Sequence, residues 1–296
     1  MNAQSWTHHR EAGTPLAIRT IVLITQACGY YAGYALLYPT CLYFMLFRTH
    51  SVRASRHFLA RVLGRPPAFR EIFRHHLTFA SCTLDRVRLA RRPDDVTVRL
   101  HGREAIESSH GGGRGCLLFG AHLGSFEVLR ALAPRYDLRV KALMYRGNAG
   151  TINGMTQRLD PGAEDMLIEI GRPDTLLRVK EALDAGETVG ILADRVIDAD
   201  KSIEVQFVGG PVRLPSGPFL LAMLLKAPIV LGFGICRAPS EYDVYFEVLA
   251  DLPAVLDEAD TQLKALAQRY ADRVAHYARE MPYNWFNFYD YWHNAA

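Results

Sequence analysis

The chain has 296 residues, of which 49% are hydrophobic and 22% are charged, and its formal net charge at pH 7 is +3. This balance argues against a disordered protein and against a nucleic-acid partner. The length fits one large α/β domain with an added segment, or two domains. The 5 cysteines are widely spaced and form no C-x-x-C pair. Their number and spacing argue against a disulfide framework or a zinc site and fit a reducing compartment.

An uncharged stretch near the N-terminus runs from Thr20 to Phe47. It exceeds the roughly 20 apolar residues that a helix needs to cross a bilayer. Its polar residues and Pro39 also fit an interfacial or re-entrant segment, or a buried core helix. More arginines follow the stretch than precede it, which predicts that the bulk of the chain faces the cytoplasm. We predict a membrane anchor over residues 1–50 and a separate domain over residues 51–296.

Two helical patterns follow the uncharged stretch. The first, from Ser51 to Leu63, is basic and predicts a helix that lies either along an anionic membrane surface or as a solvated face. The second runs from Phe69 to Arg91, with apolar residues at helical spacing. His75 and His76 are adjacent and cannot share one helix face, so we expect surface or substrate-side positions for them and no metal site.

Short β-type runs alternate with helical stretches beyond Pro93. This alternation predicts an α/β fold, a mixed but mainly parallel sheet flanked by helices. A last amphipathic helix spans Thr261 to Arg279, and an aromatic run ends the chain after Pro282. The predicted strands are Val96–Leu100, Cys116–Phe119, Val140–Tyr145, Met166–Ile170, Thr188–Ala193, Ile203–Val208, Pro228–Ile235 and Asp243–Leu249, and the helices between them are Phe126–Ala133, Asn148–Leu159, Asp174–Asp184 and Pro218–Lys226.

The stretch from Cys116 to Arg130 predicts a strand, a tight polar loop and a helix. Ligands and catalytic groups collect at the carboxyl ends of strands in open α/β sheets. Ser125 lacks the G-x-S-x-G context of a serine nucleophile. The glycines from Gly111 to Gly115 precede the strand and lack the lysine of a phosphate-binding loop. A covalent serine mechanism and nucleotide binding are therefore disfavoured.

An acid-base pair remains in this stretch. If Ser125 begins the helix, His122 lies in the loop and Glu127 lies in the first turn, so that their side chains can meet. A carboxylate hydrogen-bonded to one imidazole nitrogen fixes the tautomer and leaves the other nitrogen as a base. Such a base can take a proton from an acceptor hydroxyl. The alternative is a buried structural pair.

The pattern of His122, four residues and Glu127 resembles the H-x-x-x-x-D/E motif of the lysophospholipid acyltransferase superfamily. The surroundings are similar to its bacterial lipid A biosynthesis (lauroyl/myristoyl) acyltransferase branch. The resemblance covers nearly the whole chain, beginning with the apolar N-terminal segment. Its other blocks are Phe119 to Glu127, Tyr145-Arg146-x-Asn148, Leu192-Ala193-Asp194-Arg195, Phe207-Val208-Gly209-Gly210 with Pro215-x-Gly217, and the aromatic end.

The resemblance implies an enzyme that transfers a fatty acyl group from acyl carrier protein or coenzyme A to a lipid hydroxyl. The histidine of the family is its general base and the acidic residue orients it, which carries over to His122 and Glu127. No cofactor is implied, because the acyl thioester is a co-substrate. The expected location is the cytoplasmic face of a bacterial inner membrane, with residues 51–296 as the acyltransferase domain.

Four further residues are candidates for substrate binding: Arg146, Asn148, Asp194 and Arg195. Arg195 is suited to hold an acceptor phosphate or to polarise the thioester oxygen, but Asp194 and Arg195 also fit an internal salt bridge. The family typically has Asp-Gln where this chain has Asp194-Arg195, and the terminal aromatic run is not typical of it. These departures leave lipid A, another lipid and a pigment lipid open as acceptors.

Three roles are open for the terminal aromatic residues: packing on the sheet, a membrane belt, or a wall for the acyl chain. Two other functional classes compete with acyl transfer. A hydrolase would use water in place of the acceptor and would release the acyl group without it. A non-catalytic lipid-binding protein would tolerate the loss of His122 and Glu127.

Overall fold

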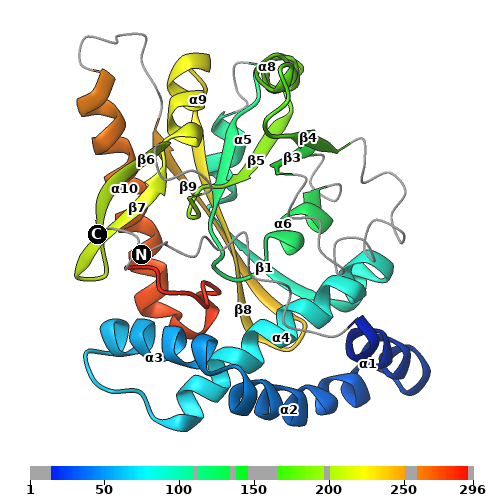
Figure 1. Cartoon of the computed structure of the whole chain (residues 1–296). Coiled ribbons are helices and arrows are strands. Elements are labelled where there is room, and N and C mark those ends of the chain that lie inside the picture. Colours follow the sequence, from blue (N-terminus) through cyan, green and yellow to red (C-terminus); the bar gives the residue numbers. More distant parts are fainter. Residues whose placement is uncertain are drawn as a thin grey trace.

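The computed structural model describes residues 15–109, 113–133, 138–145, 166–196, 201–250 and 259–292. The candidates Arg146 and Asn148 and the helix predicted over Asn148–Leu159 lie outside these residues. Within them, a central sheet is covered by helices on both faces, and further helices form a layer at one end of the molecule (Figure 1). The predicted α/β class is confirmed.

Seven of the described strands form one sheet in the order β1-β9-β8-β2-β5-β3-β4. The strands β8, β2, β5, β3 and β4 run parallel to one another, whereas β9 is antiparallel to β8 and β1 is parallel to β9. The sheet is therefore mixed and mainly parallel, as predicted. Its strands are β1 (Thr97–His101), β2 (Leu117–Gly120), β3 (Val140–Met144), β4 (Leu167–Glu169), β5 (Thr188–Leu192), β8 (Ile229–Ala238) and β9 (Glu241–Ala250).

Each face of the sheet has its own apolar core. On one face, α8 (Thr175–Asp184), α9 (Gly217–Leu225) and α10 (Ala259–Glu280) pack against side chains such as Phe119 and Phe233. On the other, α5 (Arg103–Ser109) and α6 (Phe126–Leu132) pack against alternate residues such as Leu118 and Val230. Because both faces are covered, the central strand β2 is buried along its whole length, which explains its continuous apolar sequence.

A separate antiparallel hairpin consists of β6 (Ser202–Phe207) and β7 (Gly210–Pro215). The first strand was predicted, but the second was not. Pro211 and Pro215 lie in β7 and lack a backbone N–H, which is a poor feature for a strand paired on both sides. Since β7 pairs only with β6 among the described strands, it tolerates both prolines.

The uncharged N-terminal stretch forms two helices, α1 (Pro15–Cys28) and α2 (Tyr30–Phe47). They meet at Gly29, whose φ of 89° ends one helix and begins the next. No helix in the described part of the chain is both long enough and apolar enough to cross a membrane. The single membrane-anchoring helix predicted from this stretch therefore finds no support.

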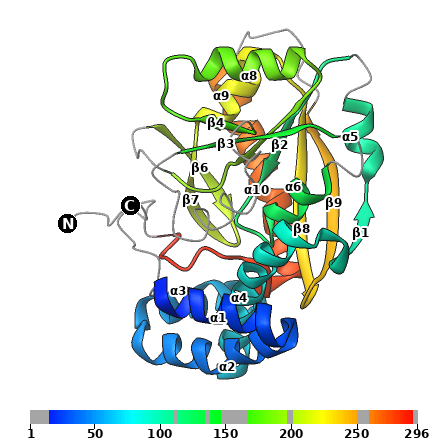
Figure 2. The ribbon, with the colours of Figure 1, turned by 90° about the vertical axis from the view of Figure 1, so that its right-hand side faces the viewer.

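Two more helices complete the layer at this end of the molecule: α3 (Thr49–Leu63) and α4 (Phe69–Arg91), both as predicted (Figure 2). The prediction of surface positions for His75 and His76 is wrong, because both side chains are buried. The ring of His75 contacts the Ser55 hydroxyl through Nδ1 and the Trp285 carbonyl through Nε2. Burial lowers the pKa of His75 to about 3, so this histidine is a neutral core residue.

The Asp85 carboxylate on α4 links the N-terminal helices to the sheet. It is fully buried and accepts hydrogen bonds from the hydroxyls of Tyr30 at 2.6 Å, Tyr242 at 2.7 Å and Ser240 at 3.0 Å. The guanidinium of Arg88 lies over the ring of Tyr30 at 4.4 Å. A buried carboxylate is stable only when its oxygens are paired in this way, so these contacts hold α2 and α4 against the β8–β9 turn.

The C-terminal segment after α10 turns back beneath the sheet and lies against α3 and α4 (Figure 1). Trp285 is fully buried, and Phe286, Tyr291 and Trp292 are nearly so. Of the three roles left open for this aromatic run, packing within the protein is the one that the structure shows. The segment packs against the hairpin and α3 rather than against the sheet alone, with Phe207 and Phe58 near Trp285.

Candidate active site

The loop after β2 carries His122, at the carboxyl end of the central strand. The hydroxyl of Tyr270 donates a hydrogen bond to the last carbonyl of the strand, at Gly120, over 2.8 Å. The carbonyl of His122 accepts a hydrogen bond from Phe286 N at 2.7 Å. Gly124, at φ 70°, turns the chain into α6, and Ser125 begins that helix as predicted. Hydrogen bonds to the carbonyls of Gly120 and His122 therefore fix the start of the loop in place.

Asp194 lies at the carboxyl end of β5, the neighbour of β2, and its carboxylate faces His122. Its Oδ1 is 2.9 Å from His122 Nδ1, and its Oδ2 accepts a hydrogen bond from the backbone N of His122 at 3.0 Å. The end of β5 therefore lies beside the His122 loop. The parallel pairing of β2 with β5 causes this contact, because it aligns the two strand ends.

Glu127 lies in the first turn of α6, but its carboxylate is paired elsewhere. Its Oε2 accepts a hydrogen bond from Arg130 Nε at 2.9 Å. In the described part of the chain, the carboxylate hydrogen-bonded to the ring of His122 is that of Asp194. The sequence predicted that Glu127 meets His122, whereas the structure brings the carboxylate of Asp194 to Nδ1.

The protonation states follow from the surroundings of the pair. Burial alone would raise the pKa of the Asp194 carboxyl, but His122, Arg195 and the amide of Asn287 lower it to about 2. Asp194 is therefore ionised at neutral pH and can only accept hydrogen bonds. His122 Nδ1 must then carry a proton, which leaves the lone pair on Nε2.

Desolvation lowers the pKa of His122, and the charge of Arg195 lowers it further, against the opposing effect of Asp194. The imidazole is thus neutral at pH 7. About a quarter of its side chain, 27%, is exposed, whereas that of Asp194 is 1% exposed. A neutral, oriented and accessible imidazole is the arrangement that general-base catalysis requires. A second arginine, Arg86 on α4, also lowers the pKa of His122.

Arg195 follows Asp194 directly but is not its salt-bridge partner among the ion pairs of the described residues. Its Nε donates to Asn287 Oδ1 at 2.7 Å, and its Nη2 donates to the Phe286 carbonyl at 3.2 Å. Arg195 and Asp194 are connected through Asn287 of the C-terminal segment. Two donors of Arg195 are engaged within the protein.

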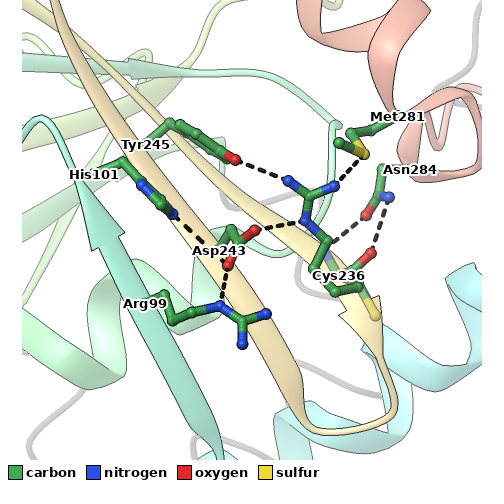
Figure 3. A network of polar contacts seen from close by, with 8 residues as sticks. Arg99, His101, Cys236, Asp243, Tyr245, Met281 and Asn284 are labelled. Atoms are coloured by element: carbon green, nitrogen blue, oxygen red, sulfur yellow. Dashed lines mark hydrogen bonds and ion pairs between the residues drawn. The ribbon is translucent and has the colours of Figure 1, made fainter.

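Asn284 anchors the same segment on the other side of the loop. Its side chain makes a pair of hydrogen bonds with the main chain of Cys236 on β8, and its carbonyl accepts from Gly124 N at 2.8 Å. Figure 3 shows this amide beside Cys236, next to the network around Asp243 near the turn between β8 and β9. In that network Asp243 is paired with Arg99 and Arg237.

Sequence reasoning missed Asn287 and Tyr270 as parts of the site, and Asn284 as an anchor of the adjoining segment. A signal for the asparagines was present, since an amide within an aromatic run is buried with that run and must find hydrogen-bond partners. What the run alone does not reveal is which partners those are. They lie on strands far away in the sequence.

The family model for bacterial lipid A biosynthesis acyltransferase matches residues 55–294. The chain belongs to this family. The match begins within α3, runs to the C-terminal segment and leaves out α1 and α2. The resemblance predicted from the sequence is confirmed, and with it the assignment of the chain as an acyltransferase. A comparison with curated proteins found no match.

Proposed function

We propose that this acyltransferase moves a fatty acyl group from a thioester, on acyl carrier protein or coenzyme A, to a hydroxyl of a lipid acceptor. The proposed location is the cytoplasmic face of the bacterial inner membrane. The membership in the lipid A acyltransferase family supports the reaction class. The observation that carries the mechanism is the hydrogen bond between His122 Nδ1 and the ionised Asp194, which leaves the basic lone pair on Nε2.

In the proposed step, His122 Nε2 accepts the proton of the acceptor hydroxyl while that oxygen attacks the thioester carbonyl. The tetrahedral intermediate then collapses, the carbon–sulfur bond breaks, and the imidazolium returns its proton to the leaving thiolate. Asp194 stabilises the imidazolium between the two events. The products are an acyl ester and a free thiol, and no covalent enzyme intermediate is required.

The roles of the other candidates are also proposals. Arg195 and Arg86 place positive charge near His122, where it can stabilise the oxyanion or attract an acceptor phosphate. Arg146 and Asn148 remain candidates for substrate binding on the strength of the family blocks. Glu127 remains a catalytic candidate on the strength of the motif, beside Asp194.

The test measures acyl transfer by the purified protein with and without a lipid A precursor. The donors are radiolabelled acyl thioesters of acyl carrier protein and of coenzyme A. We expect transfer to the lipid, and none with His122→Ala. Release of the acyl group at the same rate without an acceptor would identify a hydrolase instead. Full transfer by a folded His122→Ala protein would contradict the mechanism.

The roles of the two carboxylates are distinguished by comparing Asp194→Asn with Glu127→Gln. If Asp194 orients His122, the first change lowers kcat by about 10⁴-fold, because the imidazole loses its charged partner. The opposite ranking, with near-normal kcat in Asp194→Asn and loss of transfer in Glu127→Gln, would return the orienting role to Glu127. Circular dichroism of both proteins controls for folding.

A further inference from the structure

Asn287 lies between the catalytic pair and Arg195. Its side chain is buried, with 2% exposed. Its Nδ2 donates to Asp194 Oδ2 at 2.8 Å, while its Oδ1 accepts from Arg195 Nε at 2.7 Å. A continuous chain of hydrogen bonds therefore runs from Arg195 through Asn287 and Asp194 to the ring of His122.

The chemistry of this position requires an amide. Asp194 is ionised and needs a donor, whereas Arg195 has only donors and needs an acceptor. An amide presents one of each from a single planar group, and an apolar residue offers neither. A carboxylate would offer Arg195 its acceptor but would face Asp194 with a like charge.

The main chain around Asn287 is fixed to the same loop that it supports. Phe286 N, one residue earlier, donates to the carbonyl of His122 at 2.7 Å. The hydroxyl of Tyr291, four residues later, donates to the carbonyl of Asp194 at 2.8 Å. The amide thus stands on a segment that grips both members of the pair.

We infer that Asn287 is a positioning residue of the acyl-transfer site, which acts through Asp194 to hold His122 as the Nδ1–H tautomer. The inference rests on the proposed function of the His122–Asp194 pair. Asn287 fills the remaining acceptor site of Asp194 Oδ2, so the carboxylate cannot rotate away from Nδ1. It also keeps Arg195 from pairing directly with Asp194, which would compete with His122 for the carboxylate.

The test combines kinetics with ¹⁵N NMR of histidine-labelled protein, in which His122 is assigned by comparison with His122→Gln. In the native protein we expect the signature of a neutral ring protonated at Nδ1. In Asn287→Ala we expect a mixture of tautomers and a fall in kcat of about 10- to 100-fold, the effect known for outer partners that orient metal-bound histidines, with little change in KM. Native kcat and an unchanged tautomer in folded Asn287→Ala would overturn the inference.

Asn284→Ala provides the matched control. Asn284 belongs to the same segment and is also buried, with 4% exposed, but its side chain binds β8 rather than Asp194. We expect this change to lower the melting temperature and to leave the tautomer of His122 unchanged. An equal loss of the Nδ1–H signature in both variants would assign Asn287 a merely structural role.

A second variant keeps the test valid if Asn287→Ala does not fold. Asn287→Asp has nearly the same size, so the packing of the segment is kept. Two adjacent carboxylates share a proton, and the pKa of one of them rises. We therefore expect a loss of kcat as the pH rises through this raised pKa, on an alkaline limb that the native enzyme lacks. A pH profile identical to that of the native protein would contradict the inference.

The NMR measurement needs no substrate, so it separates the inference from the proposed function. An unchanged tautomer in an active acyltransferase would refute the role of Asn287 alone. Loss of the tautomer in a protein without acyl transfer would refute the proposed reaction and leave the positioning of His122 by Asn287 standing.

Discussion

The charge on His122 depends on opposing effects around its ring. Desolvation and the guanidinium of Arg195 lower its pKa, whereas Asp194 raises it, and the net direction is down. A protonated imidazole cannot accept the proton of the acceptor hydroxyl. Activity should therefore be high at neutral pH and fall only as the pH drops below the ordinary histidine value of about 6.5.

The acid limb of the pH profile is the range over which activity falls as the pH drops. Two substitutions should move this limb in opposite directions. Asp194→Asn removes the charge that favours the imidazolium, so the limb of the residual activity should move to lower pH. Arg195→Gln removes a charge that disfavours the imidazolium, so the limb should move to higher pH. The measurement is kcat/KM against pH for the three proteins. A shift in the same direction for both variants would contradict this account of the site.

His122 was predictable because its signal is local. A histidine in a polar loop directly after a buried apolar strand is visible within a dozen residues of sequence. Its partner was not, because Asp194 is 72 residues away and meets His122 only through the pairing of β2 with β5. The strand end that carries Asp194 was predicted, but the choice between Asp194 and Glu127 required the actual direction of each side chain.

The loop between β2 and α6 depends on a close approach of two backbones. Gly124 has a φ of 70°, and a Cβ added there would lie 2.0 Å from the carbonyl oxygen of Gly234 on β8. Ser125 N donates to that same oxygen at 2.7 Å. An L-residue at position 124 thus faces both an unfavourable φ and a rigid backbone atom.

We expect Gly124→Ala to lower the free energy of unfolding by about 3 kcal/mol or more and to abolish acyl transfer, because the loop must move. Gly209→Ala is the control. Its φ of 77° is similar, but nothing lies within 4 Å of the added Cβ, so only the φ penalty of about 1 kcal/mol applies. Urea unfolding and the transfer assay measure both effects. Equal losses of stability would show that the contact with Gly234 is unimportant.

Helices and strands whose apolar residues recur at a clear period were predicted with nearly correct bounds, as α4 and β5 illustrate. The elements that were missed or altered depend on context. The prolines of β7 are tolerated only because the strand has a single neighbour among the described strands. The uncharged N-terminal run shows no obvious end in its apolar pattern, and a single residue, Gly29, divides it into two helices.

The arrangement of the whole molecule relates the site to the N-terminal helices. The C-terminal segment that holds His122 also lies against α3 and α4. Large apolar side chains are exposed on the neighbouring α2, and Arg53 and Arg56 are exposed on α3. The large exposed apolar residues of α2 are Tyr31, Tyr38, Leu42, Tyr43, Leu46 and Phe47.

Apolar side chains beside exposed arginines are the features of a surface that binds the interface of an anionic bilayer. We therefore predict that the protein binds vesicles containing phosphatidylglycerol through α2 and α3. This mode of binding needs no spanning helix. It would bring the end of the sheet that carries His122 towards the lipid from which the acceptor comes.

The test of this binding is a double change, Leu42→Glu with Leu46→Glu, at side chains that are 44% and 66% exposed. It places two carboxylates against the anionic surface and removes apolar contacts, so vesicle binding should weaken about tenfold or more in a flotation assay. The control is Leu176→Glu with Leu177→Glu on α8, where the exposed fractions are 42% and 57%. Because α8 lies at the opposite end of the molecule from α2 (Figures 1 and 2), this control should bind vesicles like the native protein. Equal binding by both double variants would exclude α2 as the membrane-facing surface.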